Sequence, residues 1–128
     1  MNYYFATTLR LPFEEAIQRV TEALKREGFG IITEIDVRDT LKKKINVDFR
    51  NYRILGACNP ALAFEALQLE DKVGTMLPCN VVVQEIALDK TEVAAIDPVA
   101  SMQAIDNPRL KEAATQVQGK LRKVIETL

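Results

Sequence analysis

A tight hairpin late in the chain places the strongest constraint on its fold. A mostly apolar run at residues 81–88 is followed by the turn-forming pair Asp89-Lys90 and then by a second strand-like run at 91–96. Two strands joined by so short a turn pair antiparallel, because parallel neighbours need a crossover connection of about a dozen or more residues. The sequence therefore predicts a sheet that is mainly antiparallel.

Two amphipathic helices are predicted to flank this sheet. Pro12 is suited to open the first helix, and Gly28 is placed to terminate it. The pair Asn107-Pro108 supplies an N-cap and a first-turn proline for the second helix. Each helix carries one apolar stripe, formed by Phe13, Ala16, Ile17, Val20 and Leu24 in the first and by Leu110, Ala113, Ala114, Val117, Leu121, Val124 and Ile125 in the last. Single stripes are typical of helices that lie on a sheet.

The rest of the chain divides into short elements. Strands are predicted at 3–9, 30–36 and 51–58, a short surface helix at 37–45, a helix from Asn59-Pro60 to near Glu70, and loops at 71–78 and 97–106. The order is β-α-β-(short α)-β-α-β-β-α. We expect one α+β domain over residues 1–128, with two layers and one sheet backed by helices on one face. A doubly wound parallel sheet is disfavoured because the chain lacks a Gly-rich turn after its first strand.

Composition narrows the classes of partner. The chain has 128 residues and a formal net charge of −1, so it lacks the basic surface on which nucleic-acid binding depends. No apolar run approaches the roughly 20 residues that span a membrane. The N-terminus, Met1-Asn2-Tyr3-Tyr4, lacks the pattern of a secretory signal. We therefore expect a cytoplasmic protein that contacts neither nucleic acid nor membrane.

The chain contains two cysteines and no histidine. Without histidine it cannot supply a Ser-His-Asp or Cys-His catalytic group or an imidazole metal ligand. A structural zinc site needs four Cys or His ligands, and one chain offers two. We accordingly expect no metal and no cofactor.

The two cysteines each precede an asparagine and lie beside a proline. Cys58-Asn59 stands at a predicted strand end before a helix, where amides and the helix dipole favour a thiolate. Cys79-Asn80 opens the next long strand, and strand alternation places Tyr52 on the same face as Cys58. These five residues form the candidate ligand or thiol site. The alternative is a packed junction, with cysteines as small hydrophobes and asparagines as caps.

Three ordered motifs carry a family resemblance. The runs GFGIITEIDV at 28–37, YRILGACNP at 52–60 and LPCNVVV at 77–83 closely resemble the domain-of-unknown-function family numbered 302, and the likeness covers nearly the whole chain. The resemblance implies a curved antiparallel sheet backed by helices, in the fold group of the TATA-binding protein, and pairing as dimers. It implies no reaction, and fold alone is no argument for DNA binding.

Our leading hypothesis is a non-enzymatic domain, dimeric, that binds a small ligand or serves an accessory role at a cleft around Cys58, Asn59, Cys79 and Asn80. The first alternative is a thiol-based redox or sulfur-handling protein in which Cys58 is the reactive thiol and Cys79 its partner. The second alternative is a protein-interaction module that uses an exposed sheet face.

Overall fold

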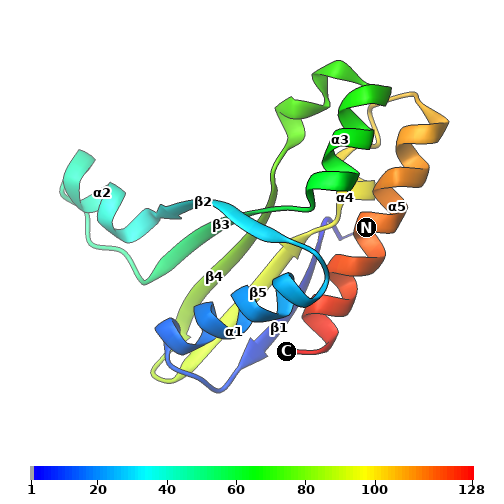
Figure 1. Ribbon diagram of the computed structural model, residues 1–128. Helices are drawn as coiled ribbons and strands as arrows, with labels where there is room; N and C mark the ends of the chain where they lie inside the picture. The colour runs from blue at the N-terminus through cyan, green and yellow to red at the C-terminus, as the bar shows by residue number, and fades with distance from the viewer. Residues whose placement is uncertain (1) are drawn as a thin grey trace.

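The computed structural model describes residues 2–128 and has an α+β fold built on one five-stranded antiparallel sheet (Figure 1). The strands are Tyr4–Leu9 (β1), Gly30–Asp36 (β2), Tyr52–Cys58 (β3), Cys79–Ala87 (β4) and Lys90–Ile96 (β5). Their order across the sheet is β1-β5-β4-β3-β2, and all four neighbouring pairs are antiparallel. The predicted fold class is confirmed. The expectation that the chain lacks a secretory signal rested on the segment from Met1 to Tyr4, and Met1 lies outside the described residues.

The helices cover one face of this sheet. They are Phe13–Arg26 (α1), Val37–Ile45 (α2), Pro60–Leu69 (α3), Pro98–Ser101 (α4) and Pro108–Glu126 (α5), with a 3₁₀ helix at Asp71–Met76 (η1). Figure 1 shows α1 and α5 against the sheet, α3 beside the first half of α5, and α2 projecting beyond the ends of β2 and β3. Within residues 2–128, no helix combines the length and the apolar character needed to cross a membrane.

The structure corrects three local predictions. The hairpin turn is Leu88-Asp89, one residue earlier than predicted, and Asp89 adopts a left-handed conformation with φ 53°. The regions predicted as loops each contain a short helix, η1 and α4. The Asp97 side chain caps α4 by accepting hydrogen bonds from the backbone amides of Val99 and Ala100. Elements this short bury too few residues to leave a periodic pattern in the sequence.

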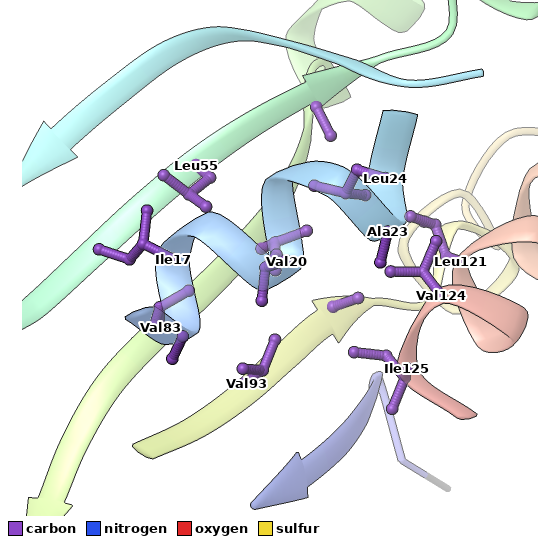
Figure 2. Close-up of a cluster of buried hydrophobic side chains, with 14 of the residues drawn as sticks. Ile17, Val20, Ala23, Leu24, Leu55, Val83, Val93, Leu121, Val124 and Ile125 are labelled. Atoms are coloured by element: carbon purple, nitrogen blue, oxygen red, sulfur yellow. The ribbon is translucent and has the colours of Figure 1, made fainter. Parts of the chain in front are cut away.

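The main core forms where α1 and α5 meet the central strands. Inward-facing side chains of β3, β4 and β5, among them Leu55, Val83 and Val93, are fully buried. The predicted stripe of α1 and the second half of the α5 stripe lie against them, and Figure 2 shows Val20, Leu24, Leu121 and Val124 in this cluster. Each buried Leu, Val or Ile side chain stabilises the fold by about 1.5–3 kcal/mol, so this layer dominates stability. Within residues 2–128, no helix lies on the opposite face of the sheet.

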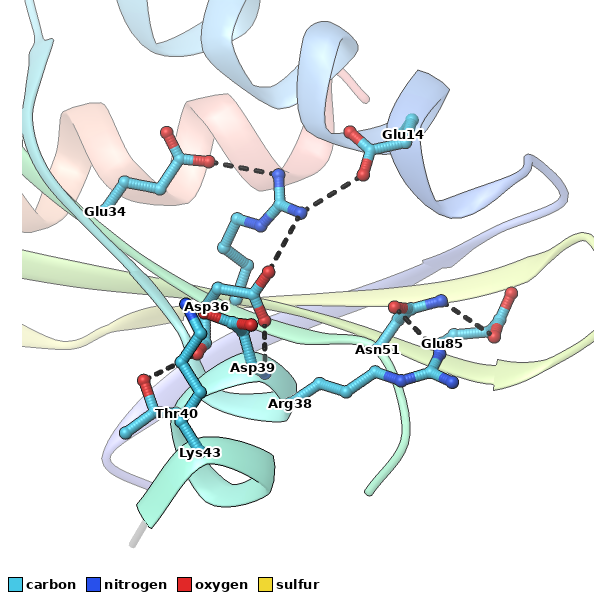
Figure 3. Close-up of polar contacts among 10 residues, drawn as sticks. Glu14, Glu34, Asp36, Arg38, Asp39, Thr40, Lys43, Asn51 and Glu85 are labelled. Atoms are coloured by element: carbon cyan, nitrogen blue, oxygen red, sulfur yellow. Dashed lines mark hydrogen bonds and ion pairs between the residues drawn. The ribbon is translucent and has the colours of Figure 1, made fainter. Parts of the chain in front are cut away.

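A polar cluster joins the base of the α2 arm to α1 (Figure 3). The Arg53 guanidinium on β3 lies 3.1 Å from a carboxylate oxygen of Glu14 and of Glu34, and 3.7 Å from Asp36. It also stacks over the Phe13 ring, 5.3 Å from the centroid. Because the Arg53 side chain is only 18% exposed, these contacts fix the angle at which β2 leaves the core.

Gly56 on β3 has no room for a side chain. A Cβ atom there would meet Thr33 Oγ1 on β2 and would lie 2.7 Å from Pro78 Cγ. A Cβ atom at Gly119 on α5 would have no neighbouring atom within 4 Å, so this position serves as a control.

Gly56→Ala should lower the free energy of unfolding by about 1–3 kcal/mol, because the Thr33 side chain and the Pro78 ring must shift to admit a methyl group. Gly119→Ala should raise it by about 0.5–1 kcal/mol through helix propensity. Urea titrations followed by circular dichroism measure both. Equal stabilities of Gly56→Ala and the wild type would contradict this account of β3.

Candidate functional site

An apolar cavity of about 310 Å³ lies between α3, η1, α5 and the adjoining ends of β3 and β4. Its walls are built almost entirely from carbon and sulfur, and include Phe29, Ala66, Leu77, Met102, Leu110 and Ala114. These residues overlap a second buried hydrophobic cluster that is separate from the core under α1.

Small side chains on the two facing helices create this space. Ala63 and Ala66 on α3 and Ala113 and Ala114 on α5 all line the cavity. A methyl group fills far less volume than the leucine or isoleucine usual between packed helices, so facing alanines leave a gap if the helices are held apart.

Two polar braces hold the helices in place. The Asn107 side chain, which caps α5, donates a hydrogen bond of 3.0 Å from Nδ2 to the Leu69 carbonyl at the end of α3. The Gln118 amide on α5 donates to both carboxylate oxygens of Asp97, the cap of α4, at 3.1 and 3.2 Å. The first brace joins α5 to α3 and the second joins α5 to α4. The helices around the cavity are therefore held in place by polar contacts and do not depend on side chains filling the space.

Cys58 and Asn59 contribute the polar edge of the cavity. Asn59 caps α3, as predicted, because its Oδ1 accepts a 3.2 Å hydrogen bond from the Leu62 amide. Its Nδ2 atom would lie 3.0 Å from a Cβ on Gly28, where the backbone has φ 85°. Among residues 2–128 this amide nitrogen has no hydrogen-bond partner, which leaves it available as a donor.

Cys79 lines the same cavity but is buried, with 7% exposure. Cys79 pairs with Ala57 across the β3–β4 ladder, so Cys58 lies one residue beyond the position directly opposite Cys79. Burial, with a smaller contribution from the nearby Cys58, raises the pKa of the Cys79 thiol to about 11. Both thiols are free, and Cys58 is the more accessible of the two.

Asn80 and Tyr52 lie elsewhere. Both side chains line a shallow groove on the uncovered face of the sheet, together with Tyr4, Gln84 and Glu92. The structure therefore brings three of the five predicted residues together and separates the other two. Tyr52 and Cys58 are the first and last residues of β3, so about 20 Å of strand separates them. Asn80 points away from Cys79 because the two are successive residues of β4.

Sequence reasoning also missed most of the cavity wall. Met102, Leu77 and the facing alanines carry no polar or motif signal that separates them from ordinary core residues. Only the small size of residues on both facing helices distinguishes this region, and that signal acquires meaning once the helices are known to be neighbours.

Comparison with known proteins identifies the family. A solved crystal structure of an uncharacterized conserved protein DUF302 from Bacillus stearothermophilus is 29% identical to this chain, covers 98% of each chain and superposes with a TM-score of 0.89. No curated protein matches the chain. The family model described as "Domain of unknown function DUF302" matches residues 5–128. This chain therefore belongs to the DUF302 family.

Proposed function

We propose that this protein is a non-enzymatic, cytoplasmic binding domain that holds a small apolar molecule in the cavity between α3 and α5. The observation that carries the proposal is the cavity itself, at about 310 Å³ with an almost wholly apolar lining. An apolar cavity of about 150 Å³ is known to bind benzene, and ligand pockets in general begin near about 300 Å³. The space suits a molecule of roughly twice the size of benzene.

The edge of the cavity favours one polar group on that molecule. The Asn59 amide nitrogen and the Cys58 thiol can each donate a hydrogen bond, so a hydroxyl, carbonyl or carboxyl oxygen suits this edge. The remainder of the ligand is hydrocarbon, and each buried CH₂ group contributes about 0.8 kcal/mol.

Thiol chemistry is the less supported function for the same site. A redox or nucleophilic role needs a thiolate near neutral pH, whereas the raised pKa keeps Cys79 protonated there. Cys58 would have to act without a thiolate partner. The ligand-binding proposal uses both sulfur atoms as cavity lining and asks neither to ionise.

A homologous series of n-alcohols from butanol to dodecanol tests the proposal. Affinity, measured by isothermal titration calorimetry, should rise about 3- to 4-fold for each added CH₂ group and then stop rising once the chain outgrows the cavity. Ala63→Phe, which points a ring into the cavity, should weaken binding of the best alcohol at least about 10-fold.

Ala61→Phe is the matched control, because Ala61 is an exposed residue on the same helix. It should bind the alcohols as the wild type does. Absence of any chain-length limit, or equal loss of binding in both variants, would show that the alcohols bind outside the cavity.

The two cysteines should differ in reactivity. With iodoacetamide at pH 8, Cys58 should be alkylated at least about 10-fold faster than Cys79, because the Cys79 pKa of about 11 leaves little thiolate. Peptide mass spectrometry resolves the two sites, and Cys58→Ala serves as the control that isolates Cys79. Rapid alkylation of Cys79 in that variant would revive the thiol alternative.

The same pKa sets a dependence of stability on pH. The unfolded thiol ionises near pH 8.5, while the folded thiol stays protonated until about pH 11. Above pH 8.5 the unfolded state therefore binds fewer protons, and stability should fall as the pH rises through this window. Relative to Cys79→Ala, the wild type should lose about 2–3 kcal/mol between pH 8 and 11. Parallel pH profiles for the two proteins would contradict the raised pKa.

A further inference from the structure

A concave groove lies on the uncovered face of the sheet, over β4 and β5. It encloses about 350 Å³, which is within the range of small-molecule sites. The small side chains of Ala94 and Val82, which pair across these strands, form its floor. Tyrosine rings flank the floor, with Tyr52 on β3 at one side and Tyr3 and Tyr4 at the β1 side. Tyr3 and Tyr4 pack edge to face, with ring centroids 5.0 Å apart.

The groove changes from polar to apolar along the strands. At one end Glu92 on β5 pairs with Gln84 on β4. Two residues further along each strand stands the apolar pair Ala94 and Val82. Positions two apart on one face of a strand are separated by about 7 Å. A molecule that suits both places has an apolar body and one polar group set a short distance from it.

The polar end carries a negative charge. Of the described residues that line the groove, Glu92 is the one with a charged side chain at neutral pH. Its Oε1 accepts a 3.1 Å hydrogen bond from Gln84 Nε2, while its Oε2 has no donor within residues 2–128. The half-buried Glu92 also forms no ion pair in that part of the chain. A carboxylate with a free oxygen accepts its strongest hydrogen bonds from cationic donors.

The neighbouring cation, Arg50, is engaged outside the groove. Its Nε donates a 2.9 Å hydrogen bond to Gln84 Oε1, and its guanidinium lies 4.4 Å from the centroid of the Phe49 ring. The bond from Arg50 fixes the Gln84 amide with its oxygen outward and its nitrogen toward Glu92. Gln84 thus holds one carboxylate oxygen of Glu92 and leaves the other open to a ligand.

From this arrangement we propose that the groove binds a protonated amine on a flat aromatic body, a molecule of the arylalkylamine class. The aromatic ring lies on Ala94 and Val82 between the tyrosine side chains, where ring-to-ring contacts are favourable. A short alkyl arm spans the step to the polar end, and the ammonium group donates to Glu92 Oε2.

The other ligand classes complement the groove less well. An anion would meet the Glu92 carboxylate with no cation among the described lining residues. A hydrocarbon would displace water from that carboxylate and supply no donor, which is costly for a charged group. The groove also shares no described lining residue with the cavity between α3 and α5, so it is a second site with a different charge preference.

Three ligands of nearly the same shape test the charge preference: 2-phenylethylamine, 2-phenylethanol and 3-phenylpropionate. Each is titrated at pH 7 into the ¹⁵N-labelled chain, and binding is read from the amide chemical shifts of Glu92 and Ala94. Binding in the cavity is read separately at Ala63 and Ala114, which line it. The amine should bind in the groove with a dissociation constant on the order of 0.1–1 mM. The alcohol and the carboxylate should bind there at least about 10-fold more weakly.

Glu92→Gln keeps the shape of the groove and removes its charge. It should weaken the amine at least about 10-fold and leave the weak binding of the alcohol in the groove within about 2-fold. Glu85→Gln is the matched control, because it removes the same charge from the residue next to Gln84, which does not line the groove. It should change the affinity for the amine by less than about 2-fold. Circular dichroism confirms that each variant is folded.

The result that overturns the proposal is defined for each step. Absence of amine binding up to about 10 mM removes the site. Equal affinities for the three ligands in the groove remove the recognition of charge. Equal weakening by Glu92→Gln and Glu85→Gln shows general attraction of cations to the surface and not this site.

The two binding proposals can fail separately. Ala63→Phe, which closes the cavity, should leave the affinity of the groove for 2-phenylethylamine unchanged. Glu92→Gln should likewise leave the binding of the n-alcohols in the cavity unchanged. A loss of amine binding in Ala63→Phe would place the amine in the cavity and overturn the second site.

Discussion

The packing of α1 and α5 against the inward side chains of β3, β4 and β5 is the contact on which the rest of the structure depends. Leu55, Val83 and Val93 are fully buried beneath these helices, and their alternation fixes which residues face outward. Because two helices cover only one face, the other face is left to solvent or to a partner. Because α5 extends past the sheet, its first half must pack on something else, and α3 fills that role.

Much of this architecture could be predicted from sequence because it rests on local periodicity. The helix stripes, the caps Asn59 and Asn107, and the late hairpin are all set by residues within a few positions of one another. The order of strands is not local in this sense. β1 pairs with β5, which is distant from it in the sequence, and no residue of Tyr4–Leu9 indicates which strand will be its neighbour.

The candidate site was predictable only in part, for a related reason. Cys58, Asn59 and Cys79 converge because β3 and β4 are neighbours and α3 begins at the end of β3. Tyr52 and Asn80 do not join them, because Tyr52 stands at the opposite end of β3 from Cys58, and Asn80 points away from its neighbour Cys79 on β4.

Small residues line the cavity between α3 and α5, and they stabilise the fold less than larger apolar residues would. A leucine in place of Ala63 or Ala113 would bury additional apolar surface and could add about 1.5–3 kcal/mol. The facing alanines do not make this contribution to stability. An unfilled space that lowers stability is expected where a ligand occupies it, which agrees with the proposed binding function.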